Sequence, residues 1–199
     1  MQIDLTDHLR CLEPHEESYL VLLTGRMVGR RVVTGHLGCP VCGKGVRIRN
    51  GVADFSGAAP GDDHTALTPE ATAAFLGLGG PGGWVALAGS AAGLVGGLVP
   101  LLPGVQLVAV NPPPALEDDE AASVLRAPRL PLKTGSMRGV VIGGDVADAA
   151  DWVADAVRAV LPGLRVVVEA PVPSPPLEGV EVLASAPACW VGKKASGKR

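Results

Sequence analysis

The fold is decided by Trp84–Leu102, WVALAGSAAGLVGGLVPLL, and by a second apolar run, Val105–Val110, that follows a Pro103-Gly104 turn. Neither run is charged, because no Asp, Glu, Lys or Arg occurs from Ala71 to Leu116. The first run is long enough to span a bilayer as a helix. Its glycines and its proline, and the lack of a basic flank, argue against a membrane span. We expect instead a strand, a glycine-rich loop that leads into a helix, and a second strand, which together form a βαβ unit.

The composition is that of a folded chain rich in small aliphatic residues. Among 199 residues, 47% are hydrophobic, 19% are charged and only 3% are aromatic. These values exclude disorder throughout the chain, and the length fits an α/β domain joined to a smaller one. The N-terminal segment contains acids and no apolar run, so no secretion signal is expected. Four cysteines, two of them in a C-x2-C pair, favour a cytoplasmic protein that binds a metal over a disulfide-bonded one.

Charge and turn content divide the chain into two unlike parts. Every charged residue in 18–53 is basic, whereas residues 58–70 (AAPGDDHTALTPE) are typical of a linker that ends where a helix begins. We therefore predict a small β domain over 1–57, a linker over 58–67, a Rossmann-like α/β domain over 68–192 and a basic tail over 193–199. No internal repeat is present.

The expected elements alternate in type through the second part. In the first part, strands are predicted over 19–24, 31–37 and 45–49, the last ending at an Asn50-Gly51 hairpin turn. The second part has predicted helices from Thr68 or Pro69 to about 76, from the glycine-rich loop to about 99, and over 146–161, closed by Pro162-Gly163. Its predicted strands are 84–88, 105–110, 139–142 and 164–169, with a terminal hairpin from 180–184 and 189–191. This order predicts a mostly parallel sheet with an antiparallel edge.

Cys39-Pro40-Val41-Cys42-Gly43 has the pattern of a zinc knuckle, in which two thiolates bind one ion and a glycine turns the backbone toward sulfur. One knuckle supplies two ligands of a tetrahedral Zn²⁺ site. Cys11 has workable spacing with His15 (C-x3-H) or His8 (H-x2-C), and His36 is a third option. We favour Cys11 and His15 as the other two ligands, because both precede the β-rich stretch. A domain of residues 1–57 has too small a hydrophobic core to be stable by itself, so we expect one structural zinc with no open coordination position.

The segment around this knuckle, VVTGHLGCPVCGKGVRIRNGVADF, resembles the second knuckle of the zinc-ribbon activator proteins that bind and stabilise tRNA, rRNA and release-factor methyltransferases. The matching positions are Val33, Gly35, Leu37, Cys39, Cys42, Gly43, Ile48 and Gly51, together with the leader Asp7-His8-Leu9-Arg10-Cys11. The resemblance covers about residues 1–57 and implies a zinc ribbon that binds a protein. The family often has a C-x-x-C first knuckle, which is here reduced to Cys11 with His15 as the expected replacement.

Val85–Gly93, VALAGSAAG, resembles the strand and glycine loop of class I S-adenosylmethionine methyltransferases. Residues 130–141 resemble the family's LP-h-x-x-x-S-F-D-h-V-h run, and residues 160–168 resemble its L-x-P-G-G-x-h-h-h run. The resemblance spans about residues 68–192. It implies a methyltransferase-type Rossmann-like sheet.

The residues that hold the cofactor in that family are mostly replaced in this chain. Gly89 and Gly93 are kept, and Asn111 stands where the ribose-binding acid is expected, so these three mark a vestigial cofactor site. The remaining positions carry Leu87 for the first acid, Ala91 for the middle glycine, Arg126 near the adenine and Arg138 in the S-F-D run. Each lost charge-assisted hydrogen bond is worth about 1.5–3 kcal/mol, so we expect no S-adenosylmethionine binding and a pseudo-enzyme.

Two groups of acids are interpreted as solvated surface. Asp145, Asp148, Asp151 and Asp155 recur on one face of a predicted helix, which could line a metal site but is typical of a solvated face. Glu117-Asp118-Asp119-Glu120 follows three prolines and is expected to form a solvated loop.

The sequence favours a non-catalytic, methyltransferase-like accessory or structural subunit that is stabilised by zinc and binds a protein partner. An active S-adenosylmethionine-dependent methyltransferase with an atypical pocket is the first alternative. The second is an RNA-associated ribbon protein that binds through Arg30, Arg31, Arg47 and Arg49. Tyr19 is the only aromatic residue in 18–53, so stacking on bases is not expected there.

Overall fold

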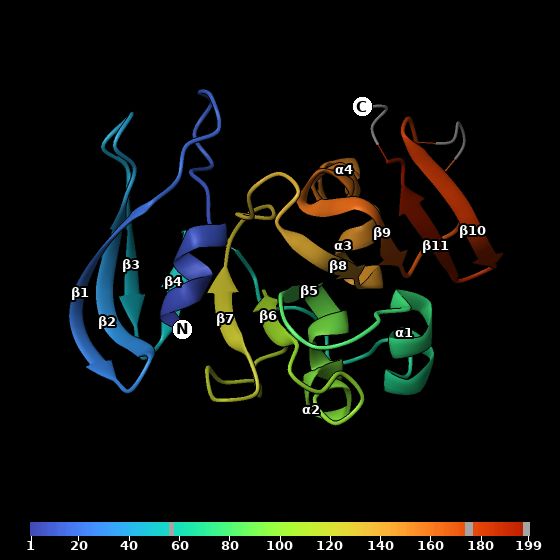
Figure 1. The fold of residues 1–199 in the computed structure, drawn as a ribbon, viewed down its shortest axis with the longest axis horizontal. Helices are drawn as coiled ribbons and strands as arrows, with labels where there is room; N and C mark the ends of the chain where they lie inside the picture. Colours follow the sequence, from blue (N-terminus) through green and yellow to red (C-terminus); the bar gives the residue numbers. More distant parts are fainter. Residues whose placement is uncertain (56–57, 174–176, 197–199) are drawn as a thin grey trace.

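The computed structural model describes residues 1–55, 58–173 and 177–196, and in this part of the chain the strands form one eleven-stranded mixed sheet (Figure 1). In chain order the strands are β1 (Val21–Val28), β2 (Arg31–Gly38), β3 (Gly45–Arg49), β4 (Val52–Asp54), β5 (Trp84–Ala88), β6 (Gln106–Val110), β7 (Ser123–Arg126), β8 (Met137–Ile142), β9 (Val160–Val168), β10 (Val180–Ala186) and β11 (Cys189–Lys194). Across the sheet their order is β1-β2-β3-β4-β7-β6-β5-β8-β9-β11-β10. We call residues 1–55 the ribbon part and residues 58–196 the Rossmann part.

The Rossmann part has a doubly wound α/β fold, as the sequence predicts. Its strands β5 to β9 pair in parallel in the order β7-β6-β5-β8-β9, and numbered from β5 this is the order 3-2-1-4-5 of a Rossmann sheet. Strand β11 then runs antiparallel to β9, and β10 antiparallel to β11. The predicted parallel sheet with an antiparallel terminal hairpin is therefore confirmed.

Two layers of helix cover the Rossmann part, one on each face of the sheet (Figure 1). Helices α1 (Pro69–Leu76) and α2 (Val95–Leu98), with the 3₁₀ helix η2 (Gly89–Leu94), pack on one face. Helices α3 (Gly144–Ala147) and α4 (Ala150–Ala159) pack on the other. Because both faces are covered, β5 is buried along its whole length, which explains its uninterrupted apolar sequence.

The ribbon part is an antiparallel meander of β1 to β4 that continues the same sheet. Its last strand pairs in parallel with β7, with Ala53 opposite Leu125 and Asp54 opposite Arg126. The N-terminal 3₁₀ helix η1 (Ile3–His8) packs over the junction and contributes Leu5 to a core that also holds residues of β7 and β8. The two parts thus share both a sheet and a hydrophobic core.

Several predicted elements are found where the sequence places them. Asn50 and Gly51 both have positive φ, 49° and 82°, as a two-residue type I′ hairpin turn requires. Helix α1 begins after Thr68, whose side chain accepts a hydrogen bond from the Ala71 N–H at 3.2 Å. Within the described residues no helix combines the length and the apolar character of a membrane span.

Other elements differ from the prediction in their bounds or were not predicted. The single helix predicted over 146–161 is divided into α3 and α4, with Asp148 and Ala149 between them, and α4 ends at Ala159. Strand β9 begins at Val160 and runs through Pro162-Gly163. Met137 of β8 pairs with Val160, and a register shift before Gly139 accommodates the proline. The glycine loop itself forms the 3₁₀ helix η2, and the short α2 follows it, in place of a continuous helix to residue 99. Strands β4 and β7 were not predicted.

Candidate metal centre and cofactor crevice

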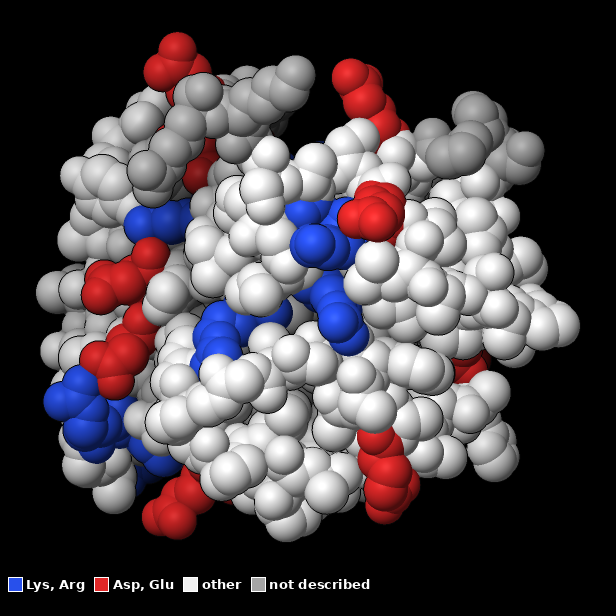
Figure 2. Space-filling view, turned by 45° about the vertical axis from the view of Figure 1, so that its right-hand side comes forward, with Lys and Arg blue, Asp and Glu red and all other residues white. Residues whose placement is uncertain are grey.

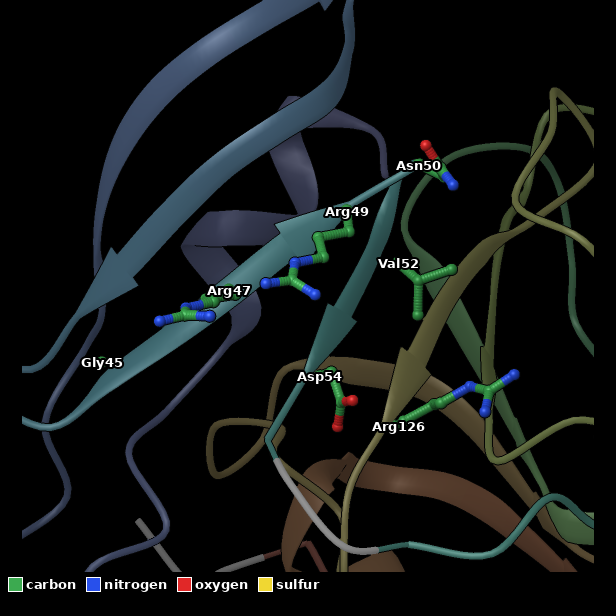
Figure 3. A pocket seen from close by; sticks show the side chains of 7 residues that line it. All are labelled: Gly45, Arg47, Arg49, Asn50, Val52, Asp54 and Arg126. Atoms are coloured by element: carbon green, nitrogen blue, oxygen red, sulfur yellow. The ribbon is translucent and has the colours of Figure 1, made fainter.

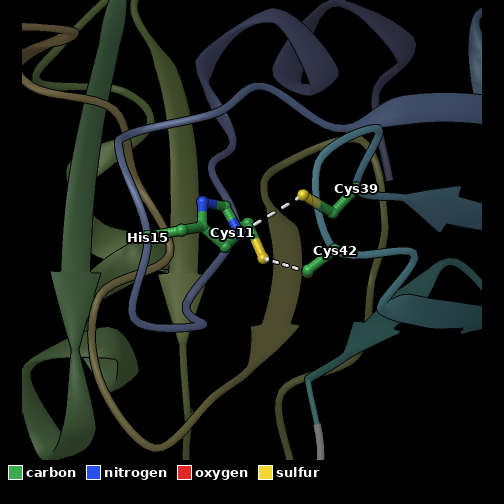
Figure 4. A group of neighbouring side chains, drawn as sticks. All are labelled: Cys11, His15, Cys39 and Cys42. Carbon is green, nitrogen blue, oxygen red and sulfur yellow. Dashed lines mark hydrogen bonds between the residues drawn. The ribbon is translucent and has the colours of Figure 1, made fainter.

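Cys11, His15, Cys39 and Cys42 lie together at one end of the ribbon part (Figure 4). Their ligand atoms all lie within 4.8 Å of one another. Cys39 follows β2, and a turn closed by a hydrogen bond from the Gly43 N–H to the Cys39 carbonyl, 3.0 Å, brings Cys42 back beside it. The loop after η1 carries Cys11 and His15 to the same place. Sequence reasoning favoured these four side chains, and the structure brings them together.

Two distances within this cluster match those of a tetrahedral zinc site. The Cys11 and Cys42 sulfurs are 3.7 Å apart, and the Cys39 sulfur lies 3.5 Å from His15 Nε2. Two thiolates at about 2.3 Å from a Zn²⁺ ion would be about 3.8 Å apart, and a thiolate and an imidazole nitrogen about 3.6 Å apart. Three thiolates and one imidazole would thus fill the four positions of a tetrahedral ion, which leaves no position for substrate.

The surroundings of the cluster favour ligand forms that bind a cation. His15 Nδ1 lies 2.7 Å from the Glu16 carbonyl, so Nδ1 carries the proton and Nε2 presents its lone pair to the thiols. Burial works to raise the pKa of the Cys39 thiol, but the backbone N–H groups of Cys42 and Val41 and the neighbouring thiols lower it to about 6. Burial is also the main cause that raises the pKa of the Cys11 thiol to about 11. Bound zinc would supply the positive charge that holds all three sulfurs as thiolates.

The alternative histidines lie elsewhere. The His8 ring packs 6.0 Å from the Trp84 ring, centroid to centroid, and burial lowers its pKa. The His36 side chain lies over Gly45 on an exposed strand. Neither belongs to the cluster of Cys11, His15, Cys39 and Cys42.

A second candidate site is the crevice at the carboxyl ends of the parallel strands, where Rossmann-like sheets bind ligands. A cavity of about 340 Å³ opens there, lined by Asn111, Pro128, Asp145, Trp152 and residues 58–62. Of the predicted cofactor residues, Asn111 lines this cavity and Gly89 contacts Gly61 and Asp145 beside it. Gly93 lies next to Pro113 and does not line the cavity.

The Asn111 side chain is occupied by the protein's own backbone. It is 5% exposed, its amide nitrogen donates to the Ala127 carbonyl at 2.7 Å, and its amide oxygen accepts from the Ala127 N–H at 2.9 Å. The backbone of Asn111 has a φ of 51°, a left-handed conformation that asparagine tolerates better than most residues. Both polar functions of the amide are thus used to join the ends of β6 and β7.

The segment that follows the ribbon part crosses the glycine loop. The Gly61 N–H donates to the Asn111 carbonyl at 2.8 Å, and a Cβ on Gly61 would meet the backbone carbon of Gly89 at 2.6 Å. The Asp145 carboxylate accepts from the Ser90 N–H at 2.8 Å and from the Asp62 N–H at 3.0 Å. The Ser90 N–H of the glycine loop, which could otherwise donate to a ligand, is therefore bonded to the Asp145 carboxylate.

Sequence reasoning missed the position of Asp145, which was interpreted as part of a solvated helix face. Asp145 stands three residues after the buried strand β8, and an acid at the carboxyl end of a parallel strand is the signal that could have found it. Glu169, which directly follows β9, was also missed. Its carboxylate accepts from the Thr65 hydroxyl at 2.6 Å and from the Gly144 N–H at 3.2 Å, so it ties the same segment down.

Two of the acids predicted to be solvated are buried in ion clusters. Asp155 is 2% exposed and accepts from Arg129 Nε at 2.8 Å and from Arg158 Nε at 3.0 Å. Asp118 has a side chain that is 3% exposed, and it pairs with Arg31. Asp148 and Asp151 are exposed, as predicted, but they do not share one helix, because Asp148 lies in the turn between α3 and α4 whereas Asp151 belongs to α4. Ion pairs with distant segments explain why Asp155 and Asp118 are buried.

The two arginines that replace acids of the methyltransferase pattern do not enter the crevice. Arg126 lines a different hollow, beside β3 and β4. Arg138 lies at the amino end of β8 and donates to the carbonyls of Gly79, Gly80 and Pro81 at 2.9–3.0 Å. Leu87, at the position of the first acid, is fully buried in the core.

Comparisons with known proteins find similarity in the course of the backbone and none in the sequence. No family model matches the sequence, and no curated protein matches it. Among solved structures, the chain is similar to a protein from Methanococcus maripaludis, provisionally described as an S-adenosyl-L-methionine-dependent methyltransferase, with a TM-score of 0.46 and 9% identity over 65% of this chain and 84% of that one. It is also similar to the antibiotic-resistance methyltransferase Kmr, with a TM-score of 0.44 and 14% identity over 70% of this chain and 99% of that one.

Proposed function

We propose that the chain is a non-catalytic, methyltransferase-like accessory or structural subunit, stabilised by one structural zinc, that acts by binding a protein partner. The proposal that the chain is non-catalytic rests on the crevice, where polar groups are hydrogen-bonded within the chain. Its asparagine is bonded on both sides to Ala127, and the Ser90 amide of its glycine loop is bonded to Asp145. S-adenosylmethionine needs hydrogen-bonding groups for its ribose diol, and this crevice offers it no free one at Asn111.

The zinc in this proposal is structural. Four candidate ligands lie together, and the Cys11–Cys42 and Cys39–His15 distances are those of a closed tetrahedral site, which leaves no position for a reacting group. The ion would join the loop after η1 to the end of β2. The four cysteines are free thiols, and zinc binds cysteine only in its reduced form. We therefore place the protein in a reducing compartment such as the cytoplasm.

The free edge of the ribbon part supports a protein partner. Strand β4 uses its outer edge to pair with β7, so a partner strand could not bind there. Strand β1 forms the opposite edge of the sheet and has exposed apolar side chains, among them Val21, Leu23 and Val28, of which Leu23 is 73% exposed. An exposed apolar edge strand is a typical site for pairing with a strand of another protein.

The test is purification of the tagged full-length chain from its native source, with wild type compared with Leu23→Lys. The proposal expects a stoichiometric partner with wild type that is lost with Leu23→Lys. Val182→Lys, on the exposed strand β10 at the other edge, is the matched control and should retain the partner. A chain that purifies alone, or a partner retained equally by both variants, would refute binding at this edge.

One observation favours the alternative of an active methyltransferase. The cavity of about 340 Å³ lies at the carboxyl ends of the strands, where Rossmann-like enzymes bind their ligands, and Asp145 and Trp152 line it. Such an enzyme would have to displace residues 58–62 from the glycine loop before the cofactor could bind. Binding of S-adenosylmethionine distinguishes the two functions.

A further inference from the structure

A hollow of about 500 Å³ lies on the sheet face beside β3, β4 and β7, away from both sites described above (Figure 3). Three arginines line it: Arg47 and Arg49 from β3, and Arg126 from β7. All three are exposed. The hollow exists because helices cover this face of the sheet only over the Rossmann part, and the face is open from β7 outward to the ribbon strands.

The sheet register fixes the spacing of these arginines. Arg47 lies opposite Asp54 on β4, and Asp54 lies opposite Arg126 on β7, so the three form a row across three strands. Neighbouring strands are about 4.8 Å apart, which puts the backbones of Arg47 and Arg126 about 10 Å apart. Arg49 is two residues from Arg47 on the same face of β3, about 7 Å along the strand.

The hollow has an excess of positive charge. Three arginines and one aspartate line it, which gives a net charge of +2 at neutral pH. Asp54 is engaged, and within the described ranges none of the three arginines forms a salt bridge. By contrast, two arginines that the sequence also put in the basic segment are paired with acids: Arg30 with Asp4 and Arg31 with Asp118. The hollow therefore brings together, at one place, three arginines that have no acidic partner in the described part of the chain.

The lining distinguishes between two kinds of anionic partner. A protein partner would need an apolar centre that is buried on binding, and Val52 is the only large apolar side chain among the lining residues. No aromatic side chain lines the hollow, so there is no platform on which bases could stack. Guanidinium groups on an open strand face match phosphate groups, which arginine binds in a bidentate manner and without regard to base sequence.

We propose that the hollow formed by Arg47, Arg49 and Arg126 binds the phosphate backbone of a nucleic acid. Binding depends on charge and on the spacing set by β3 and β7, and it is insensitive to base sequence. The chain has a formal net charge of −3, so a general excess of positive charge does not account for such binding. On the face drawn in Figure 2, basic and acidic side chains lie in small groups among uncharged residues. The site requires neither the crevice nor the free edge of β1, so it goes beyond the proposed function.

The experiment measures fluorescence anisotropy of a short labelled RNA duplex, and of the DNA duplex of the same sequence, against salt concentration. Each phosphate contact contributes about −0.9 to the slope of log K against log salt, so three contacts predict a slope of about −2.7. Affinity should then fall about 40-fold between 50 and 200 mM salt. A variant with Arg47→Ala, Arg49→Ala and Arg126→Ala should lose most of this slope, and RNA and DNA should respond alike.

A charge-matched variant, Arg26→Ala with Lys133→Ala and Lys193→Ala, removes three positive charges from other places and should keep the slope. Thermal unfolding of both variants checks that they fold like wild type. Three results would overturn the proposal: no binding of wild type at 50 mM salt, an equal loss in both variants, or a preference for a polyglutamate peptide over both duplexes. The last result would assign the hollow to an acidic protein segment.

Discussion

Asn111 illustrates how a substitution at one position can change the role of a whole site. In the methyltransferase pattern an acid at this position would bind ribose, but here the amide bridges to Ala127 through a donor and an acceptor. An aspartate could accept from the Ala127 N–H but could not donate to the Ala127 carbonyl. The asparagine is therefore explained by the structure of the loop and not by a ligand.

This explanation predicts that Asn111→Asp destabilises the protein. A buried carbonyl would lose its partner and face a carboxylate, at a cost of about 1–3 kcal/mol in the free energy of unfolding. Asn50→Asp is the matched control, because Asn50 also has a positive φ but is exposed in a hairpin turn, and it should change stability little. Urea denaturation measures both. Equal stability of Asn111→Asp and wild type would mean that the amide is not needed by the loop.

Asp155 supports a second prediction at the scale of single residues. Its buried carboxylate binds Arg129 and Arg158 and lies 3.5 Å from Arg10, so Asp155→Asn leaves three guanidinium groups without their shared anion. We expect a loss of about 3–5 kcal/mol, whereas Asp151→Asn on the exposed side of α4 should change stability by less than about 0.5 kcal/mol. Chemical denaturation of the two variants checks this. A similar, small effect for both would contradict a structural role for the cluster.

Among the elements, those with strong local signals could be predicted from the sequence. The apolar strand β5, the capped helix α1 and the Asn50-Gly51 turn each follow from a few neighbouring residues. Strands β4 and β7 are too short for a hydrophobic pattern to reveal, and they are defined by their pairing with neighbouring strands, β4 with β3 and β7, and β7 with β4 and β6. In the same way, Val160 became part of a strand because it pairs with Met137, a contact that helix periodicity cannot anticipate.

The candidate sites were predictable to different degrees for a related reason. The four side chains of the candidate metal cluster could be selected from cysteine and histidine spacing, although spacing alone left His8 and His36 open. The crevice residues Asp145 and Glu169 and the hollow residue Arg126 acquire their roles from distant segments, so only the folded chain identifies them.

The pairing of β4 with β7 makes a prediction about zinc. Because the ribbon and Rossmann parts share a sheet and a core, loss of the metal should weaken the whole chain and not only one part. Cys39→Ser should lose stoichiometric zinc and lower the midpoint of a single thermal transition, with a loss of several kcal/mol. Cys189→Ser, outside the cluster, should retain both the zinc and the transition.

Elemental analysis and calorimetry measure these two properties together. A Cys39→Ser protein as stable as wild type would contradict the structural zinc. Two separate transitions, of which only one responds to the substitution, would contradict a shared sheet that unfolds as a unit.

At the scale of the whole molecule, three surfaces have distinct expected tasks. The cluster of Cys11, His15, Cys39 and Cys42 is proposed to stabilise the ribbon part by binding zinc, the free edge at β1 is proposed to bind a protein, and the arginine hollow is proposed to bind phosphate. The crevice, which would be the active site in an enzyme of this fold, is crossed by residues 58–62 and bonded to them through Asn111 and Asp145. The fold is therefore proposed to serve as a scaffold whose function has moved from the crevice to its outer surfaces.

The most direct test of this account is titration calorimetry of S-adenosylmethionine into the full-length protein, after its zinc content and its single unfolding transition have been verified. The account predicts no binding heat up to about 1 mM ligand, because the groups that would bind the cofactor are bonded within the chain. A one-to-one isotherm with a dissociation constant in the micromolar range would contradict it, since residues 58–62 would then have to leave the glycine loop readily and the crevice would be a working cofactor site.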